Sequence, residues 1–315
     1  MKDLFYTCIV LSVFCVSNVY ADTVQDIGDG DIVHIKDFTD STTYRDLERM
    51  INPWSAENTY RHGEDLYRNW NSEESIVLLK QAANENHFLA KARLVLLNFI
   101  KTKLNTDIER ECFSKLSSMA ENNIDAAILL SSYYKQGCGT NKDIKKMIDI
   151  RLKLAESEDA YAQGLVGDAY RDGMGVQKDL TKAFYWYQKS ANHNCAYGQY
   201  GLGICYRFGL GTQKDQEKSF YWFQKSAEQG NAQGQVFLGD CYILGQGTSK
   251  DVEKAFYWYK RAAEQGHSYA QYKLSLLYYA GKGTAKDEEK SMYWLQKSAD
   301  NGCSDAQKLL QRLGR

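Results

Sequence analysis

Residues 232–267 read AQGQVFLGDCYILGQGTSKDVEKAFYWYKRAAEQGH. In the first half, apolar residues recur at helical spacing with small glycines between them. In the second half, the apolar residues of segment 255–263 fall at i, i+3, i+4, i+7 and i+8, which makes a broad apolar helix face. The glycines of segment 245–248 and Gly266 can take the positive φ that ends a helix. The stretch therefore predicts a first helix, called helix A, a glycine turn, and a second helix, called helix B.

This unit recurs with a period of 36 residues. Several sets of Gly, Lys, Asp, Tyr and Ala share that interval with the tryptophans, and positions related by it are called a column. The tryptophan column contains Trp186, Trp222, Trp258 and Trp294. An aspartate ahead of each helix B, such as Asp251, is placed to cap free backbone N–H groups. Two short helices cannot bury such faces alone, so segment 160–303 predicts four stacked helix-turn-helix repeats that share a core.

Weaker copies of the unit precede these four repeats. Tyr134 and Gly137 occupy the same columns one period earlier, where Ile150 replaces the tryptophan, and helix B of that unit is predicted to be shorter or bent. Residues 57–159 therefore predict degenerate helical repeats, and residues 304–315 predict a C-terminal capping helix. The predicted fold class is all-α, a right-handed α/α superhelical solenoid of six or seven helix-turn-helix repeats.

In these columns the chain resembles the Sel-one-like repeat family, a branch of the tetratricopeptide-like solenoids. The resemblance extends over residues 160–303, with local departures such as Asn194 in place of a glycine and Ser275 in place of a helix A glycine. It implies a scaffold or adaptor, because family members serve in protein quality control, in bacterial envelope processes and in host interaction. The residues that carry it are LG at 238–239, GQGT at 245–248, KD at 250–251, WY at 258–259 and AAEQG at 262–266.

The first 21 residues have the pattern of a secretory signal peptide. Lys2 precedes an apolar run over residues 4–16, and the small residue Ala21 suits a cleavage site. We therefore expect an exported chain, periplasmic or secreted, or in the secretory pathway of a eukaryote. An uncleaved anchor or a buried first helix is the alternative. Residues 22–56, with turn-forming glycines and the single proline, Pro53, predict a linker.

Composition and motifs argue against several function classes. The hydrophobic content of 43% is enough to bury a continuous core, while 39 basic and 40 acidic residues provide no overall field for nucleic acid or an anionic membrane. GKGT at 281–284 lacks the Ser or Thr that must follow the lysine of a phosphate loop. The five histidines are scattered, and no nucleophile, base and orienting group can be nominated. We expect no enzyme, no cofactor and no metal.

Six cysteines follow residue 21: Cys112, Cys138, Cys195, Cys205, Cys241 and Cys303. Cys205 and Cys241 share a column of adjacent units, which stacking places about 10 Å apart, beyond disulfide reach. In the family that the chain resembles, a cysteine-rich secreted branch has its own cysteine pair in each repeat, and that spacing is missing. We interpret the cysteines as small core residues, with a disulfide framework as the alternative.

Helix A residues that are not needed for packing predict a partner-binding surface. By analogy with tetratricopeptide units, they line the concave face of the solenoid, and their mixture of aromatic and polar side chains suits a protein or peptide. In contrast, four glutamines recur without change in helix A, which favours a structural hydrogen bond. The predicted partner-binding residues are Tyr161, Asp168, Arg171, Tyr197, Tyr200, Arg207, Asp240, Tyr269, Tyr272 and Tyr279.

These observations predict an exported, monomeric, non-enzymatic adaptor that binds a protein or peptide and no nucleic acid. Three alternatives remain open. Several of the tyrosines could merely pack between neighbouring units. The chain could be an enzyme or inhibitor that binds cell-wall or other small ligands, as claimed for cysteine-rich relatives. It could also be a cytosolic or membrane-tethered adaptor if residues 1–21 are retained, and membrane contact is expected only in that case.

Overall fold

The computed structural model describes residues 55–68, 72–103 and 106–314. Contacts divide the chain into two units, Met1–Asn52 and Pro53–Arg315, and only the second contains described residues. The predicted signal peptide (1–21) and nearly all of the predicted linker (22–56) lie outside them. Within the described residues, every regular element is an α-helix.

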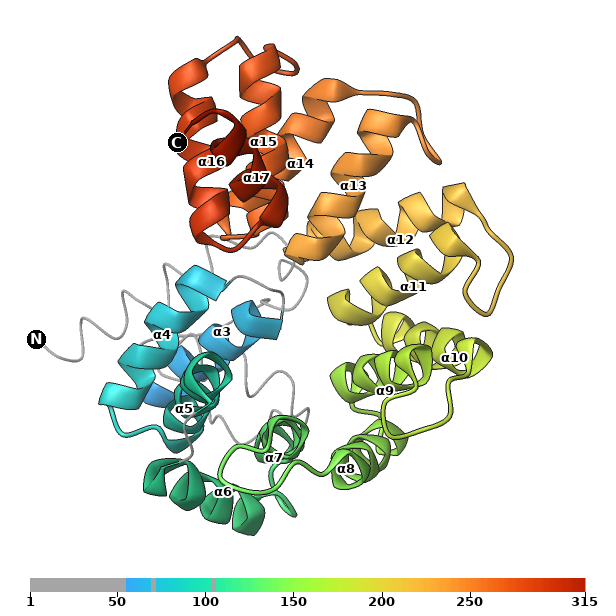
Figure 1. Cartoon of the computed structure of the whole chain (residues 1–315). Coiled ribbons are helices and arrows are strands. Elements are labelled where there is room, and N and C mark those ends of the chain that lie inside the picture. Colours follow the sequence, from blue (N-terminus) through green and yellow to red (C-terminus); the bar gives the residue numbers. More distant parts are fainter. Residues whose placement is uncertain (1–54, 69–71, 104–105, 315) are drawn as a thin grey trace, which may run out of the picture. The chain divides into compact units, whose positions relative to one another are not determined.

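The helices of the described residues form seven helix-turn-helix pairs and one final helix (Figure 1). Each helix packs against the next one along the chain, and first helices of successive pairs also touch, as α9 does α11. The predicted all-helical repeat solenoid is therefore confirmed. The helices are α3 (Ala56–Arg68), α4 (Ser72–Asn84), α5 (Phe88–Thr102), α6 (Asp107–Met119), α7 (Ile124–Gln136), α8 (Ile144–Glu156), α9 (Ala160–Asp172), α10 (Leu180–Asn192), α11 (Ala196–Phe208), α12 (Gln216–Glu228), α13 (Ala232–Leu244), α14 (Val252–Glu264), α15 (Ser268–Ala280), α16 (Glu288–Asp300) and α17 (Ser304–Arg312).

Helix B of each pair in the regular part of the chain begins at an aspartate cap. The Asp251 carboxylate accepts a hydrogen bond from the backbone N–H of Lys254 at 2.9 Å, and Asp143 caps α8 in the same way. This bond satisfies an orphan donor of the first turn. Helix α8 was predicted to be shorter or bent. It is 13 residues long, as α10 is, so the expectation of a shorter helix was wrong.

Two glycines of each turn have different tasks. Gly245 ends α13 in the left-handed region, with φ 69°, where its N–H bonds the carbonyl of Cys241. Gly247 also has positive φ, but it lies against the preceding pair as well: a Cβ there would be 2.1 Å from the carbonyl oxygen of Gln216. One glycine therefore turns the chain, and the other allows adjacent pairs to approach closely.

Helix B covers helix A glycines with an aromatic ring. A Cβ built on Gly203 of α11 would lie 2.7 Å from the ring of Phe223 on α12, and Gly239 meets Tyr259 in the same manner at 2.9 Å. Both rings are almost completely buried. The small residues predicted from sequence to permit close helix approach therefore receive the largest core side chains.

Buried hydrogen bonds tie the helices together between these rings. Gln235 and Gln271 donate from Nε2 to the carbonyls of Ala227 and Ala263, at 3.3 and 3.1 Å, and both side chains are fully buried. Gln163 follows the same pattern, whereas Gln199 donates to Asn194 instead. The recurring glutamines thus have the structural hydrogen bonds that their column predicts.

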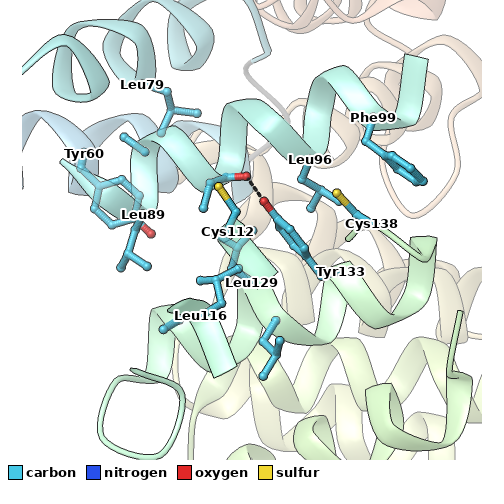
Figure 2. Packing of buried hydrophobic residues seen from close by; sticks show 14 of the residues in the cluster. Tyr60, Leu79, Leu89, Leu96, Phe99, Cys112, Leu116, Leu129, Tyr133 and Cys138 are labelled. Carbon is cyan, nitrogen blue, oxygen red and sulfur yellow. Dashed lines mark hydrogen bonds between the residues drawn. The ribbon is translucent and has the colours of Figure 1, made fainter. Parts of the chain in front are cut away.

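The first pairs share a core although their sequence repeats only weakly. Figure 2 shows Leu96 of α5 beside Tyr133 of α7, whose hydroxyl donates to the carbonyl of Ala92 at 2.7 Å. Cys112 and Cys138 belong to this cluster. All six cysteines of the described residues are free thiols, and five of them are buried. Five of these cysteines therefore occupy core positions, and Cys195 is partly buried.

The two roles of glycine can be separated by substitution. We expect Gly247→Ala to destabilise the fold by about 2–4 kcal/mol, because the new methyl group overlaps the Gln216 carbonyl in addition to the cost of positive φ. Gly230→Ala is the matched control, since Gly230 has φ +89° but nothing within 4 Å of a Cβ, and about 1 kcal/mol is expected. Urea unfolding measures both, and equal losses would contradict the close-approach role.

His267 predicts a pH dependence of stability. Its Nδ1 accepts the cap bond of α15 from the N–H of Ala270 at 3.3 Å, and burial lowers its pKa to about 4. The folded state therefore favours the neutral form of His267, whereas the unfolded chain takes up a proton near the ordinary pKa of about 6.5. The contribution of neutral His267 to the free energy of unfolding is complete above that pH and is lost as the pH falls toward 4. Between pH 7 and 4 we expect up to about 3 kcal/mol of this loss.

His267→Asn should remove this part of the acid sensitivity. Asn231, one period earlier, caps α13 through its amide oxygen at 2.8 Å from the N–H of Gly234, so the substitution keeps a cap that does not titrate. Urea unfolding of both proteins at pH 7, 5.5 and 4 measures the difference. Parallel pH profiles would show that His267 does not carry it.

Candidate functional site

A cavity of about 740 Å³ lies among the first helices of successive pairs. Side chains of α3, α5, α7, α8, α9, α11 and α13 line it, together with Met174 after α9 and the residues that precede and begin α15. Four of the predicted partner-binding residues meet there: Tyr161, Asp168, Arg171 and Tyr197. The structure therefore brings together the part of the predicted surface that belongs to α9 and α11.

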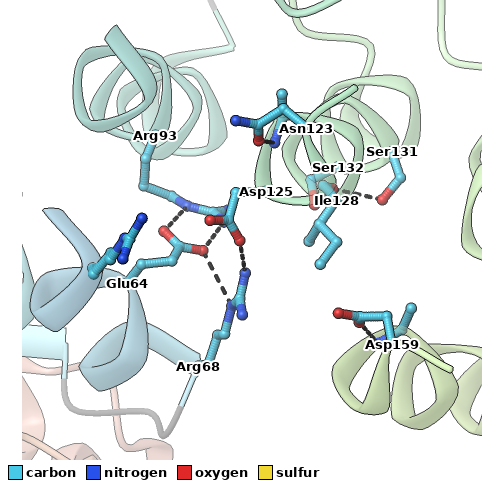
Figure 3. Close-up of polar contacts among 12 residues, drawn as sticks. Glu64, Arg68, Arg93, Asn123, Asp125, Ile128, Ser131, Ser132 and Asp159 are labelled. Atoms are coloured by element: carbon cyan, nitrogen blue, oxygen red, sulfur yellow. Dashed lines mark hydrogen bonds and ion pairs between the residues drawn. The ribbon is translucent and has the colours of Figure 1, made fainter. Parts of the chain in front are cut away.

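One wall of the cavity is a buried ion-pair network (Figure 3). Glu64 of α3 accepts from Nε of Arg93 at 3.0 Å and also from its Nη2, and Nε of Arg68 lies 3.6 Å from the same carboxylate. Nη2 of Arg68 also forms an ion pair with Oδ1 of Asp125 on α7, at 2.6 Å. Burial alone would raise the pKa of Glu64, but Arg93 and Arg68 hold it below its ordinary value. The network links three helices by charge-assisted bonds.

A second cluster surrounds Asp168 on α9. Its carboxylate accepts from the hydroxyls of Tyr187, at 2.5 Å, and Tyr197, and lies 3.0 Å from Nη1 of Arg171. Arg171 also forms a bidentate pair with Asp172, at 2.8 and 2.9 Å. The hydrogen bond to Asp172 and the nearby carboxylates raise the pKa of Arg171 above its ordinary value. Both tyrosines and the arginine are therefore held in place by acids of their own chain.

Aromatic rings connect the two clusters. The rings of Tyr161 and Tyr197 lie 5.4 Å apart, and the guanidinium of Arg68 lies 4.9 Å from the centre of the Tyr161 ring. Arg93 stacks similarly on Tyr67, at 4.5 Å. The cavity thus combines π faces, which favour cations and apolar groups, with fixed positive charge.

Four cationic residues of this cavity were not predicted: Arg68, Arg93, Lys135 and Arg151. Arg68 and Arg93 belong to weakly repeating segments, where no column identifies a surface. Arg151 had a signal, because the same column contains Tyr187, Phe223, Tyr259 and Leu295 in the later repeats. A single arginine in an otherwise apolar column indicates that the side chain has a role other than filling the core.

Other predicted residues lie elsewhere along the helix A surface. The ring of Tyr200 packs 5.6 Å from that of Phe237, and burial raises its pKa to about 12. Arg207 stacks 5.3 Å from the same Phe237 ring. Asp240 accepts from the hydroxyl of Tyr259 at 2.6 Å. For Tyr200 the contacts match the alternative in which a tyrosine packs between units.

The last predicted residues lie on α15. Tyr269 and Tyr272 have ring centres 6.3 Å apart, and the ammonium of Lys273 lies 4.9 Å from the Tyr269 ring. Tyr279 is 61% exposed, with Lys286 5.4 Å from its ring. These residues line a separate stretch of helix A surface and do not reach the cavity.

In residues 55–314, outside the short undescribed gaps, no group of His, Cys, Asp and Glu could hold a metal ion. The helices of the described residues lack the length and apolarity that a membrane span requires.

Stacked helix pairs with a surface formed by helix A define a helical-repeat scaffold. The family model of the Sel1 repeat matches residues 56–87, 160–195, 196–231, 232–267 and 268–303, more than half of the chain. The chain belongs to the Sel1 repeat family. Repeats of this family generally mediate protein–protein interaction.

Solved structures agree with this assignment. A Sel1 repeat protein from Oxalobacter formigenes is 30% identical, with a TM-score of 0.56 over 70% of this chain and 86% of its own. The protein c5321, a protective antigen of uropathogenic Escherichia coli with an SLR fold, is 27% identical, with a TM-score of 0.52; 85% of this chain aligns with 58% of that one. Comparison with curated protein sequences gave no match.

The ion-pair network predicts a large effect of Glu64→Gln. The change leaves Arg93, whose side chain is 4% exposed, without its charge partner, so we expect a loss of about 3–5 kcal/mol in the free energy of unfolding. Arg110→Gln is the control, because it breaks the exposed pair with Asp107, which should be nearly neutral. Urea unfolding compares them, and similar values for both would contradict a stabilising network.

Proposed function

We propose that this chain is an exported, non-enzymatic adaptor that binds a protein or peptide on the surface formed by its helix A residues. The cavity among α5, α7, α9 and α11 carries the proposal, because its walls combine tyrosines and arginines. These residue types are favoured in interface centres, where they supply large contact areas with polar handles.

The arrangement of the cavity supports docking in preference to catalysis. Asp168, Tyr187, Tyr197 and Arg171 bond one another, and Glu64 is held by two arginines. Such groups are pre-organised, so a partner meets side chains whose rotamers are already fixed. General protein interaction by Sel1 repeats points in the same direction. We propose that the chain does this as a monomer.

A small-ligand binder is the second candidate, because a volume of about 740 Å³ also suits a small molecule. Its ligand would be a cell-wall compound or another small molecule. Native mass spectrometry of the purified chain separates the candidates by revealing any retained small molecule.

Export rests on the signal-peptide pattern of residues 1–21. Sequencing of the mature N-terminus distinguishes cleavage after Ala21 from a cytosolic or membrane-tethered adaptor that keeps these residues.

Exposed apolar residues continue the helix A surface beyond the cavity. Phe208 and Leu244 share the column of Asp172, and Tyr279 shares the column of Arg171. Asp172 and Arg171 themselves line the cavity. Phe208 and Leu244 are each 51% exposed. They provide a site that can be changed without opening the core.

A pull-down with matched variants tests the adaptor proposal. We expect the wild-type chain to recover a partner that the helix A variant Phe208→Ala/Leu244→Ala/Tyr279→Ala loses by at least tenfold, because several interface contacts disappear together. The control changes three tyrosines of helix B with similar exposure: Tyr185→Ala/Tyr221→Ala/Tyr257→Ala. It should recover the partner like wild type.

Mass spectrometry reads the recovered proteins, and circular dichroism verifies the helices of each variant. If the helix B variant no longer recovered the partner and the helix A variant still did, the binding surface would lie on the second helices of the pairs. No partner for any of the three proteins would contradict the adaptor proposal.

A further inference from the structure

Arg151 occupies a position that the other repeats fill with an apolar or aromatic core side chain. Its column continues with Tyr187, Phe223, Tyr259 and Leu295, each no more than 2% exposed. Arg151 is itself only 5% exposed. Burying a guanidinium is costly unless a carboxylate pairs with it, so this exchange lowers stability unless something compensates.

Within the described residues, the compensation is small. Nε of Arg151 donates to the hydroxyl of Ser131 at 3.2 Å, and no carboxylate of the described part of the chain lies within ion-pair distance. Arg93, which is equally buried, shows the contrast, because it forms a bidentate pair with Glu64. The partner of Arg151 is therefore a neutral hydroxyl, whereas the partner of Arg93, another buried arginine of the same cavity, is a charged carboxylate.

The helix A side of the contact has also changed. In the next three repeats this column lies over a glycine, such as Gly167 beneath Tyr187, whereas α7 has Ser131. The last repeat also has a serine there, Ser275, and Leu295 in the column of Arg151. The next residue of α7 is Ser132, which lines the cavity. Its column contains Asp168 and Asp240, whose carboxylates accept the hydroxyls of Tyr187 and Tyr259 at 2.5 and 2.6 Å.

The repeat that carries a buried cation thus lacks the acid that two other repeats place opposite the same position. A side-chain carboxylate next to Ser132 would occupy the place that Asp168 and Asp240 take in their own repeats. The chain supplies none there within its described residues.

A second cation, which has no ion pair among the described residues, lies close by. Lys135 is one helical turn after Ser131 on α7, so the two side chains share a face. It lines the cavity, is partly buried, and forms no ion pair within the described residues. Burial, with the positive charge of Arg151, lowers its pKa below the ordinary value. An anion between the two cations would relieve both effects.

We infer that Arg151 and Lys135 form the binding site for an aspartate or glutamate side chain of an acidic peptide. This rests on the proposed function, because the peptide would lie in the cavity of the helix A surface. The fork of Arg151 can hold a carboxylate by parallel hydrogen bonds, while Tyr161 and Tyr197 offer aromatic walls to neighbouring residues of the peptide.

The charges nearby favour a carboxylate over a phosphate. Arg171, which shares a column with Lys135, is already paired with Asp168 and Asp172. That group has a surplus of one negative charge, and it stands beside the two unpaired cations. A singly charged carboxylate suits the remaining positive charge, whereas a dianionic phosphate would meet repulsion from Asp168 and Asp172.

Arrays of random heptapeptides, probed with the fluorescently labelled full chain, provide the first test. The peptides are attached through the C-terminus, so that only side chains supply carboxylates, and a second array has free C-termini. We expect enrichment of Asp or Glu at one peptide position on both arrays. Binding that requires a free C-terminus, or binding without acidic enrichment, overturns the inference and leaves the adaptor proposal intact. No binding to any heptapeptide overturns the inference, while the pull-down decides the adaptor proposal separately.

Affinity measurements with the best-bound heptapeptide provide the second test. Arg151→Gln should weaken binding at least about tenfold, because a desolvated charge pair is lost. The triple variant Ser131→Gly/Ser132→Asp/Arg151→Tyr, which copies the residues of α9 and α10, should bind equally weakly while its unfolding midpoint is no lower than that of wild type. Lys145→Gln removes an exposed charge from the same helix and should leave affinity unchanged.

Two further measurements address the nature of the anion and the role of Arg151. The heptapeptide with Gln or Asn in place of its acid should bind the wild type as weakly as the acidic peptide binds Arg151→Gln. Inorganic phosphate should not compete at millimolar concentration, and efficient competition would assign the site to phosphate instead. Unchanged affinity of a folded Arg151→Gln or triple variant for the acidic peptide would overturn the inference.

Discussion

The close contact between helix B rings and helix A glycines holds the repeats together. Tyr187 of α10 shows the constraint from both sides, because a Cβ on Gly167 of α9 would lie 2.7 Å from its ring, and one on Gly201 of α11 would lie 2.3 Å from it. One ring therefore fills the space between two successive first helices. Side chains larger than hydrogen at either glycine would separate the helices and open the core.

The turns and caps follow from this spacing. Adjacent pairs approach so closely that the second glycine of a turn, Gly247, touches the backbone of α12, and the aspartate caps place helix B at a defined start. Each pair contacts mainly its neighbours, so stability is distributed along the chain as in other repeat proteins. The network of Arg68 adds a contact of longer range, because it joins α3 to Asp125 of α7 and to the Tyr161 ring of α9.

Sequence periodicity predicted most of the fold but only some of the residues that line the candidate cavity. Within residues 160–303 every repeat has the same two turn glycines and the same aspartate cap of helix B, so local chemistry determined where the helices end and begin. The first helices of the cavity were harder to interpret, because Arg93 and Glu64 come together only after α3 and α5 pack, and no spacing in sequence reports a contact between them. Four cavity residues could be predicted, because their columns change from repeat to repeat beside core columns that stay constant. They are Tyr161, Asp168, Arg171 and Tyr197.

Comparison of the repeats with one another separates packing from function more sharply than burial does. Tyr187 and Arg151 are almost equally buried and belong to the same column, yet the tyrosine fills a glycine pocket and bonds an aspartate. Among the described residues, the arginine donates to the hydroxyl of Ser131 and has no carboxylate within ion-pair distance. Packing alone does not explain the arginine, because the later repeats fill the same position without burying a charge. A repeat protein retains such a costly residue where stability is exchanged for an interaction that the chain cannot complete by itself. For that reason, the irregular repeat of α7 and α8 identifies the specific part of a cavity whose other walls come from α3, α5, α9 and α11.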